Sequence, residues 1–225
     1  MLATLTALLV FQGANTLTPE EVNAGWKLLF DGQTTKGWKN FKSETIRPGW
    51  KVVDGTLKSV DPNTAGDIVS ADKYDWFELK LDYNLDKGQN SGVMFHVADD
   101  GEATWHSGPE IQLYDDEGVT GAEKSGWLYQ LYKSNVDSAK PAGQWNTMRV
   151  MIAPDKCFTE INGTKYYEYT LWSDDWNARV AKSKFSFYPE FGKLKTGRIA
   201  IQGDHGVVAF RNIKIRPIKV PTTVN

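Results

Sequence analysis

The chain has 225 residues and a net charge of −2 at pH 7, with 26 Lys and Arg against 28 Asp and Glu. Without a dense basic stripe it lacks the electrostatic signature of a nucleic-acid-binding protein, so nucleic acid is excluded as a partner. A single cysteine, Cys157, rules out an internal disulfide and a cysteine-based metal site. Aromatic residues make up 12% of the chain, which favours either an aromatic sandwich core or stacking on sugar rings.

An apolar segment opens the chain. Residues 1–11 have the length of a signal-peptide core and are too short to span a bilayer, so no transmembrane segment is expected. We interpret residues 1–18 as a signal peptide, which predicts a periplasmic or secreted protein, and a packed or disordered tail is the alternative. Residues 19–220 are expected to form one domain, because all-β sandwiches often reach this size.

Two short helices are predicted from capping residues. Thr18-Pro-Glu-Glu21 resembles a capping box with proline at the first helical position, so a helical turn is expected before Gly25. Ser173 is a suitable N-cap for a helix from Asp174 to Lys184, with acidic residues in its first turn.

The remaining pattern is that of β-strands. Residues 77–85 alternate apolar and polar side chains, which is typical of a strand with one solvent-facing side. Asp54-Gly55 and Asn162-Gly163 each separate two strand-like runs and predict β-hairpins. Many short strands with one or two short helices predict an all-β protein, a jelly-roll sandwich of two antiparallel sheets.

His205 lies in a glycine-flanked turn and is the first candidate functional residue. Gly203 and Gly206 bracket it, and strand-like runs precede and follow the turn. A histidine in such a turn can present its imidazole at the rim or face of a sheet.

Glu110, Gln112 and Tyr114 form the second candidate group. On a strand they share one face, whereas Ile111 and Leu113 point to the other. A carboxylate, an amide and a phenol spaced about 7 Å apart suit the binding of one sugar ring. An exposed sheet face with ordinary polar residues is the alternative.

Four further residues are candidates for substrate binding. His96 ends a strand-like run, although a lone histidine there also fits a structural role. Trp105, Trp127 and Tyr129 fall in loops, where their rings would form walls of a carbohydrate cleft.

Several catalytic signatures are missing from the sequence. It contains no phosphate-binding loop, dinucleotide-binding glycine motif, nucleophile elbow or His-Glu-x-x-His zinc motif. Conventional glycoside hydrolysis normally uses two carboxylates, and the Glu110 strand supplies one, because Asp115 lies on its other face. The strand therefore lacks the second carboxylate that this mechanism needs.

Taken together, these segments resemble the 3-keto-disaccharide hydrolase domain family. The resemblance covers about residues 24–217 and follows the family's order of motifs. The matching segments are Trp26-Lys-Leu-Leu-Phe-Asp-Gly32, Gly37-Trp38, Asn90-Ser-Gly-Val93, Gly108-Pro-Glu-Ile-Gln-Leu-Tyr-Asp115, Pro141-Ala-Gly-Gln-Trp-Asn146, Asn162-Gly163, Trp172-Ser-Asp-Asp-Trp176, and the His205 segment through Phe210-Arg-Asn-Ile213. The family's usual Gln-Asp-His-Gly is one residue longer here, Gln202-Gly203-Asp204-His205-Gly206.

The resemblance implies a sandwich of the concanavalin A-like lectin and glucanase type, and cleavage of glycosides oxidised to a ketone at C3. Such a ketone acidifies the C2 proton, so one base can start an elimination of the C1 leaving group, with hydration afterwards. Glu110 and His205 are the candidate catalytic residues. Gln112 and Arg211 are candidates for binding sugar or enolate oxygens, with Arg211 packed and paired beneath the site as the alternative. Gln202 is a further candidate for substrate binding.

No cofactor follows from the sequence with certainty. A divalent metal could stabilise the enolate, with Glu110 and His205 as candidate ligands. The expected partner is an oxidised 3-keto glycoside or another carbohydrate, and the oligomeric state stays open. Two other hypotheses are a non-catalytic carbohydrate-binding sandwich and a structural or calcium-stabilised surface module.

Overall fold

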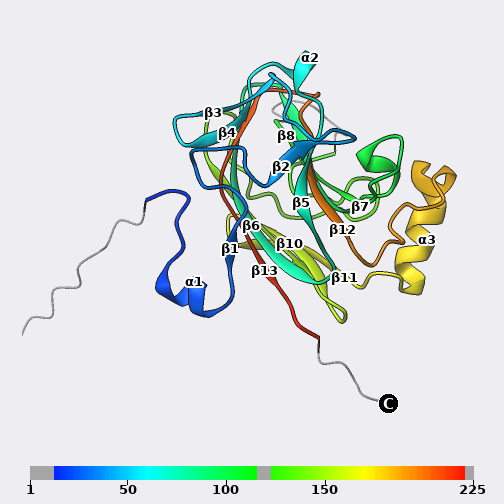
Figure 1. Ribbon diagram of the computed structural model, residues 1–225. Coiled ribbons are helices and arrows are strands. Elements are labelled where there is room, and N and C mark those ends of the chain that lie inside the picture. Colours follow the sequence, from blue (N-terminus) through cyan, green and yellow to red (C-terminus); the bar gives the residue numbers. More distant parts are fainter. Residues whose placement is uncertain (1–12, 116–122, 221–225) are drawn as a thin grey trace, which may run out of the picture.

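The computed structural model describes residues 13–115 and 123–220, and its strands pair into two antiparallel sheets (Figure 1). The larger sheet has the order β11-β10-β9-β6-β13-β4-β3, with β1 also paired to β13. Its strands are β1 (Lys27–Leu28), β3 (Trp50–Val53), β4 (Thr56–Ser59), β6 (Phe77–Leu85), β9 (Asn146–Ile152), β10 (Cys157–Ile161), β11 (Thr164–Tyr169) and β13 (Val208–Pro217). The smaller sheet has the order β2-β5-β12-β7-β8. Its strands are β2 (Trp38–Asn40), β5 (Ile68–Tyr74), β7 (Asn90–Val97), β8 (Glu110–Tyr114) and β12 (Gly197–Ile201).

One hydrophobic core lies between the two sheets. Leu79 and Leu81 of β6 enter it from the larger sheet, and Ile111 and Leu113 of β8 enter it from the smaller one; each is at most 1% exposed. Because strand side chains alternate, the residues between them face outward on each sheet. The predicted sandwich of two antiparallel sheets is confirmed, and each sheet has an outer face on which a site can form.

Both predicted hairpins are present. Asp54 and Gly55 connect β3 to β4 with φ angles of 48° and 72°, and Asn162 and Gly163 connect β10 to β11 with 50° and 80°. Two consecutive positive φ angles define the turn whose twist matches that of paired strands. Asparagine, aspartate and glycine tolerate this backbone best, which is why the sequence signal was specific.

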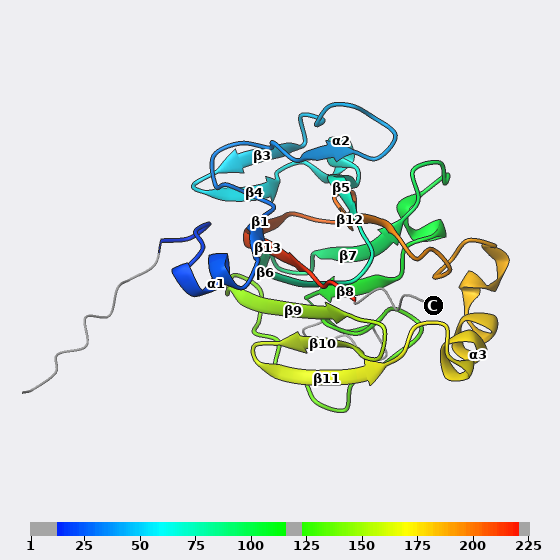
Figure 2. The same ribbon diagram turned by 60° about the horizontal axis from the view of Figure 1, so that its bottom comes forward.

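The helices are short and lie outside the sheets. They are α1 (Pro19–Asn23), α2 (Pro62–Ala65), α3 (Asp174–Lys182), and the 3-10 turns η1 (Thr104–His106) and η2 (Lys184–Phe187). The capping box of α1 forms as predicted, and the Ser173 hydroxyl accepts a hydrogen bond from the Trp176 amide at the start of α3. Figure 2 shows α1 and α3 at opposite sides of the sandwich. Among the described residues no helix is long and apolar enough to cross a membrane.

The end of α3 differs from the prediction. The helix stops at Lys182, because Ser183 has extended backbone and its hydroxyl accepts from the Phe185 amide, starting η2. This places Lys184 in a separate turn. The apolar segment 1–11, interpreted above as a signal peptide, lies outside the described residues.

The glycine-flanked segment of His205 connects the two sheets. It follows β12 of the smaller sheet and leads into β13 of the larger sheet, so it is a crossover and not a hairpin. Gly203 packs closely within it, since a Cβ at this position would lie 2.4 Å from the Gly66 carbonyl oxygen. The crossover therefore places His205 at the edge of the smaller sheet's outer face.

Candidate functional site

A pocket of about 250 Å³ lies on the outer face of the smaller sheet, across β7, β8 and the end of β12. Two strands, three connections and the turn η2 supply its walls. The lining residues are Asn90, Trp105, Glu110, Gln112, Tyr129, Lys184, Phe185, Gln202 and His205. The pocket thus brings together six of the predicted site residues, from segments more than 90 positions apart in the chain.

Strand β8 places Glu110 in the floor of this pocket. Glu110 and Gln112 point outward as the alternation predicts, yet they are only 8% and 6% exposed, because loops cover this part of the sheet. Across from them on β7, Gly92 leaves the room that the Glu110 carboxyl occupies. A Cβ on Gly92 would lie 2.0 Å from Glu110 Oε1.

The pKa of the Glu110 carboxyl is shifted upward, toward neutral pH. Burial, and then the nearby carboxylate of Asp67, raise its pKa to about 7 from an ordinary value of 4.5. The charges of His205 and Lys184 act in the opposite direction. A carboxylate with a pKa near neutrality is suited to take and return protons.

His205 is paired with the residue before it. Its Nδ1 lies 2.5 Å from Asp204 Oδ1, and this contact is the main reason that the pKa of His205 is raised above 6.5. The Asp204 pKa is lowered by the same contact. Asp204 orients the ring and stabilises the imidazolium, so His205 is suited to donate a proton.

Lys184 brings a positive charge into the pocket. Its Nζ lies 4.5 Å from the centre of the Tyr129 ring, 5.8 Å from that of Trp105 and 3.4 Å from the Tyr129 hydroxyl. Sequence reasoning missed this residue because it was assigned to the end of α3. The Ser-Lys-Phe-Ser turn after the helix offers no distinctive signal.

Two buried amide oxygens in the pocket have no partner. Asn90 Oδ1 and Gln202 Oε1 accept no hydrogen bond from any residue that the structure describes. An unsatisfied buried acceptor is costly, and hydroxyl groups of a bound sugar would satisfy it. The backbone fixes Gln202 well, because its amide donates to the Gly92 carbonyl and its own carbonyl accepts from Ser91 Oγ.

Residues 25–216 match the family described as the 3-keto-alpha-glucoside-1,2-lyase-like domain. The chain belongs to this family. It is 29% identical over 227 residues to a 3-keto-disaccharide hydrolase of Bacteroides thetaiotaomicron, covering 85% of this chain and 78% of the relative.

Solved structures agree with membership of the lyase-like family. A Parabacteroides distasonis protein, provisionally named a glycosyl hydrolase, superposes with a TM-score of 0.85 at 32% identity, over 92% of this chain and all of the other. The exoplasmic domain of VIP36, solved with calcium and mannose, has a TM-score of 0.53 at 8% identity, over 90% and 93% of the two chains. That second likeness shows the fold alone, which is the predicted concanavalin-like sandwich.

Four predicted substrate-binding residues do not line the pocket: His96, Tyr114, Trp127 and Arg211. His96 is the clearest case: a bulge in β7 gives it a φ of 53° and turns it away, leaving it 2% exposed. Its Nε2 lies 2.7 Å from the Asp75 carbonyl oxygen, and burial lowers its pKa. Tyr114 is half-buried beyond the pocket, and Trp127 lies beneath the Lys133 ammonium at 5.4 Å.

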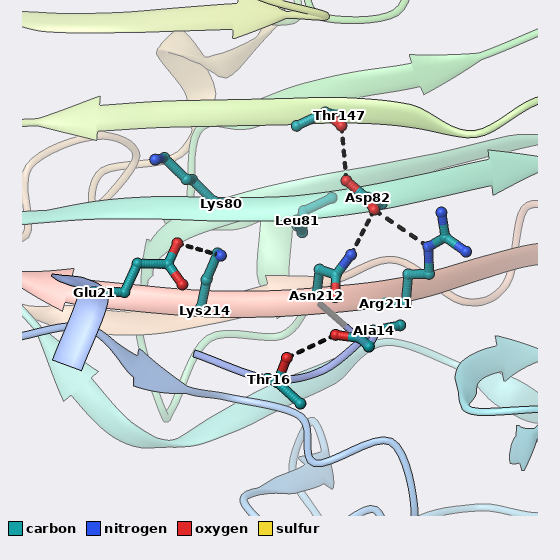
Figure 3. A pocket seen from close by; sticks show the side chains of 11 residues that line it. Ala14, Thr16, Glu21, Lys80, Leu81, Asp82, Thr147, Arg211, Asn212 and Lys214 are labelled. Carbon is teal, nitrogen blue, oxygen red and sulfur yellow. Dashed lines mark hydrogen bonds and ion pairs between the residues drawn. The ribbon is translucent and has the colours of Figure 1, made fainter. Parts of the chain in front are cut away.

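Arg211 lies on the outer face of the other sheet, so it does not reach Glu110. Its Nε donates to Asp82 Oδ2 at 3.2 Å, and its guanidinium stacks on Trp145 at 4.0 Å. Figure 3 shows it in a separate pocket of about 350 Å³, where Asp82 also accepts from Thr147 and Asn212. The lining carboxylates there are engaged with neighbouring side chains, so Arg211 is packed and paired as the alternative expected, but on the opposite sheet and not beneath the Glu110 site.

Replacing Arg211 by Ala is expected to leave the chemistry of the Glu110 pocket unchanged. The loss of its ion pair and its stacking on Trp145 should lower the free energy of unfolding by about 1 kcal/mol. Denaturant unfolding and steady-state kinetics of the purified variant check both parts. A large fall in kcat with intact folding would contradict this placement of Arg211.

The described residues supply no ready metal centre. Among them no group of three or more His, Cys, Asp and Glu side chains could hold a metal ion. Glu110 and His205, the candidate ligands, reach the same pocket, but Asp204 is bound to His205 and Asp67 to Thr104. The steps proposed below are therefore carried by protein side chains.

Proposed function

We propose that the Glu110 pocket cleaves glycosides of 3-keto sugars by C2 proton abstraction, elimination and hydration. The proposal rests mainly on the position and the pKa of Glu110. Among the residues that the structure describes, it is the only carboxylate lining the pocket, and its pKa is about 7. One base of this kind suffices for an acidified C–H bond, whereas ordinary glycoside hydrolysis calls for two carboxylates.

The proposed first step moves one proton. The Glu110 carboxylate takes the C2 proton, and the electrons of the C–H bond pass to the C3 oxygen, which becomes an enolate. The Lys184 ammonium stabilises the negative charge of that oxygen, a role for which the sequence offered Gln112 and Arg211. Burial of the pocket floor strengthens this attraction.

The second step breaks the glycosidic bond. The enolate returns its electrons, the C1–O bond breaks, and the leaving oxygen takes a proton from the His205 imidazolium. Water then adds across the C1–C2 double bond of the enone: its hydroxyl goes to C1 and its other proton to the His205 imidazole, while Glu110 returns its proton to C2, so both side chains regain their starting states. The products are a free 3-keto sugar and an alcohol, so the overall reaction is a hydrolysis.

A panel of 3-keto glycosides and their unoxidised parents tests the proposal. Turnover of the oxidised substrates alone, with exchange of the C2 hydrogen for deuterium in deuterium oxide, is the expected result. Cleavage of the unoxidised parents at equal rates would overturn it. Repeating the assay with a chelator tests the separate prediction of a divalent metal.

Replacing Lys184 by Met is expected to lower kcat by about 10²-fold, because the variant keeps the length of the side chain and loses the charge that faces the enolate. Lys182→Met is the matched control, since Lys182 ends α3 and lies outside the pocket. Steady-state kinetics of both variants decide the matter. Equal kcat values would remove Lys184 from the mechanism.

A non-catalytic carbohydrate-binding function is the second candidate. It is favoured by the rings of Trp105 and Tyr129 in the pocket and by the unpartnered oxygens of Asn90 and Gln202. In that case calorimetry would detect sugar binding without turnover. Trp105→Ala would weaken it, while Glu110→Gln would not.

We also propose export to the periplasm or the medium, on the basis of the apolar segment at residues 1–11. Cell fractionation followed by N-terminal sequencing tests this. Recovery of the protein in the cytoplasmic fraction with residues 1–11 intact would refute it.

A further inference from the structure

Asp67 is a partly buried carboxylate that helps to raise the pKa of Glu110 but takes part in none of the proposed proton transfers. It directly precedes β5, and both of its oxygens are engaged. Oδ2 accepts a hydrogen bond from the Thr104 hydroxyl, and Oδ1 accepts one from the Gly203 amide at 3.2 Å. Each oxygen thus accepts one hydrogen bond, an arrangement that suits an ionised carboxylate.

The two segments joined by Asp67 carry different walls of the pocket. Thr104 opens η1, whose next residue is Trp105, in the connection between β7 and β8. Gly203 lies two residues before His205, in the crossover from β12 to β13. These connections are about 100 positions apart in the chain and have no strand pairing of their own.

The Gly203 end of this link is tightly packed. A Cβ on Gly203 would lie 2.4 Å from the Gly66 carbonyl oxygen and 2.6 Å from Trp50 Nε1, and these two atoms already form a 2.8 Å hydrogen bond. The Gly203 carbonyl accepts from Ser59 Oγ at 3.0 Å. Gly203 is therefore held in place beside Asp67, and His205 follows it two residues later.

The Asp67 backbone is also fixed. Its carbonyl oxygen accepts from the Phe41 amide at 2.9 Å and from Asn40 Nδ2 at 3.1 Å. A carboxylate on a fixed backbone, bonded to one residue of each of two loops, restrains both loops at once. A loop error of about 1 Å at a reacting group can cost 10²-fold in rate.

We propose that Asp67 is a positioning residue that holds the Trp105 turn and the His205 crossover at a fixed separation across the pocket. It touches no reacting atom. Its effect on turnover rests on the proposed function, but the geometry of the link does not depend on that function.

Comparison of Asp67→Ala with Asp67→Asn tests the link. Asparagine can accept from the Gly203 amide through its oxygen and donate to Thr104 Oγ1 through its nitrogen, whereas alanine can do neither. We expect kcat/KM to fall about 10²-fold in the Ala variant, mostly through kcat, and less than about tenfold in the Asn variant. Thr104→Val removes one of the two bonds and should lie between them.

Imidazole NMR signals give a second readout that needs no substrate. The chain has three histidines, so the His205 signal is readily assigned by substitution. At pH about 9, well above the ordinary imidazole pKa, we expect the His205 signal to shift in Asp67→Ala and to return toward wild type in Asp67→Asn. His96, bonded to the Asp75 carbonyl, is the internal control and should stay unchanged.

The outcomes are distinct. An unmoved His205 signal in Asp67→Ala overturns the proposal, and so does an equal movement of His96, which would indicate a general loss of structure. If wild-type protein fails to turn over 3-keto glycosides, the proposed function fails while the NMR comparison still decides the link. If turnover is intact in Asp67→Ala, the link fails while the proposed function stands.

Discussion

Replacing Glu110 by Gln is expected to lower kcat on 3-keto glycosides by about 10² to 10⁴-fold. The amide keeps the shape of the side chain and cannot accept the C2 proton. Deuterium exchange at C2 should be lost to the same extent, because it reports the proton abstraction directly. In the wild type, kcat/KM should fall as the pH drops below about 7, because protonated Glu110 is inactive as a base.

The same variant should be more stable than the wild type at high pH. Glu110 has a raised pKa in the folded protein, so folding favours its protonated form, and its ionisation destabilises the fold as the pH rises from 4.5 toward about 7. Above that range the ionised carboxyl lowers the free energy of unfolding by roughly 3 kcal/mol at most, a loss that the Gln variant does not suffer. Below pH 4.5 the carboxyl is protonated in both the folded and the unfolded state, so the two proteins should not differ for this reason.

Urea unfolding at both ends of this pH range measures the difference, with Asp115→Asn as a control for general charge effects. Asp115 ends the same segment and binds the Gly88 amide outside the pocket. A Glu110→Gln protein that is inactive and stabilised at high pH fits a buried base. An active variant would exclude Glu110 as the base, and an unchanged pH dependence of unfolding would mean that its carboxyl is not desolvated.

The parts of the site that the sequence predicted follow from local rules. Glu110 and Gln112 share the outer face of β8 because strand side chains alternate, and this holds wherever a strand is regular. The hairpin turns and the helix caps are equally local, since Gly163 and Ser173 act on residues within a few positions. These features needed no knowledge of how the sheets pack.

The remaining features depend on contacts between distant segments. Alternation fails at His96, because a bulge against β12 shifts the strand by one residue and turns the ring away. Arg211 follows His205 by six positions, yet it does not reach the site, because the crossover sends β13 to the other sheet. Lys184 and Asp67 reach the site through a turn and a loop whose partners lie far along the chain.

Replacing Gly92 by Ala is expected to impair turnover nearly as much as the loss of Glu110 itself. Gly92 has no positive φ angle, so an alanine there meets no backbone strain. The new Cβ would instead lie 2.0, 2.7 and 2.8 Å from Oε1, Cδ and Cγ of Glu110. The carboxyl must swing away, which should lower kcat by about 10²-fold.

The cost to folding should be smaller than the cost to activity, because the atoms that must move are the far end of one flexible side chain. Gly13→Ala is the control, since a Cβ on Gly13 meets no atom within 4 Å. Kinetics and unfolding of the two variants separate the effects. If Gly92→Ala keeps its full kcat, Glu110 does not act as a base from its position beside β7. If the double variant Gly92→Ala, Glu110→Gln is no slower than Glu110→Gln alone, both changes affect the same proton transfer.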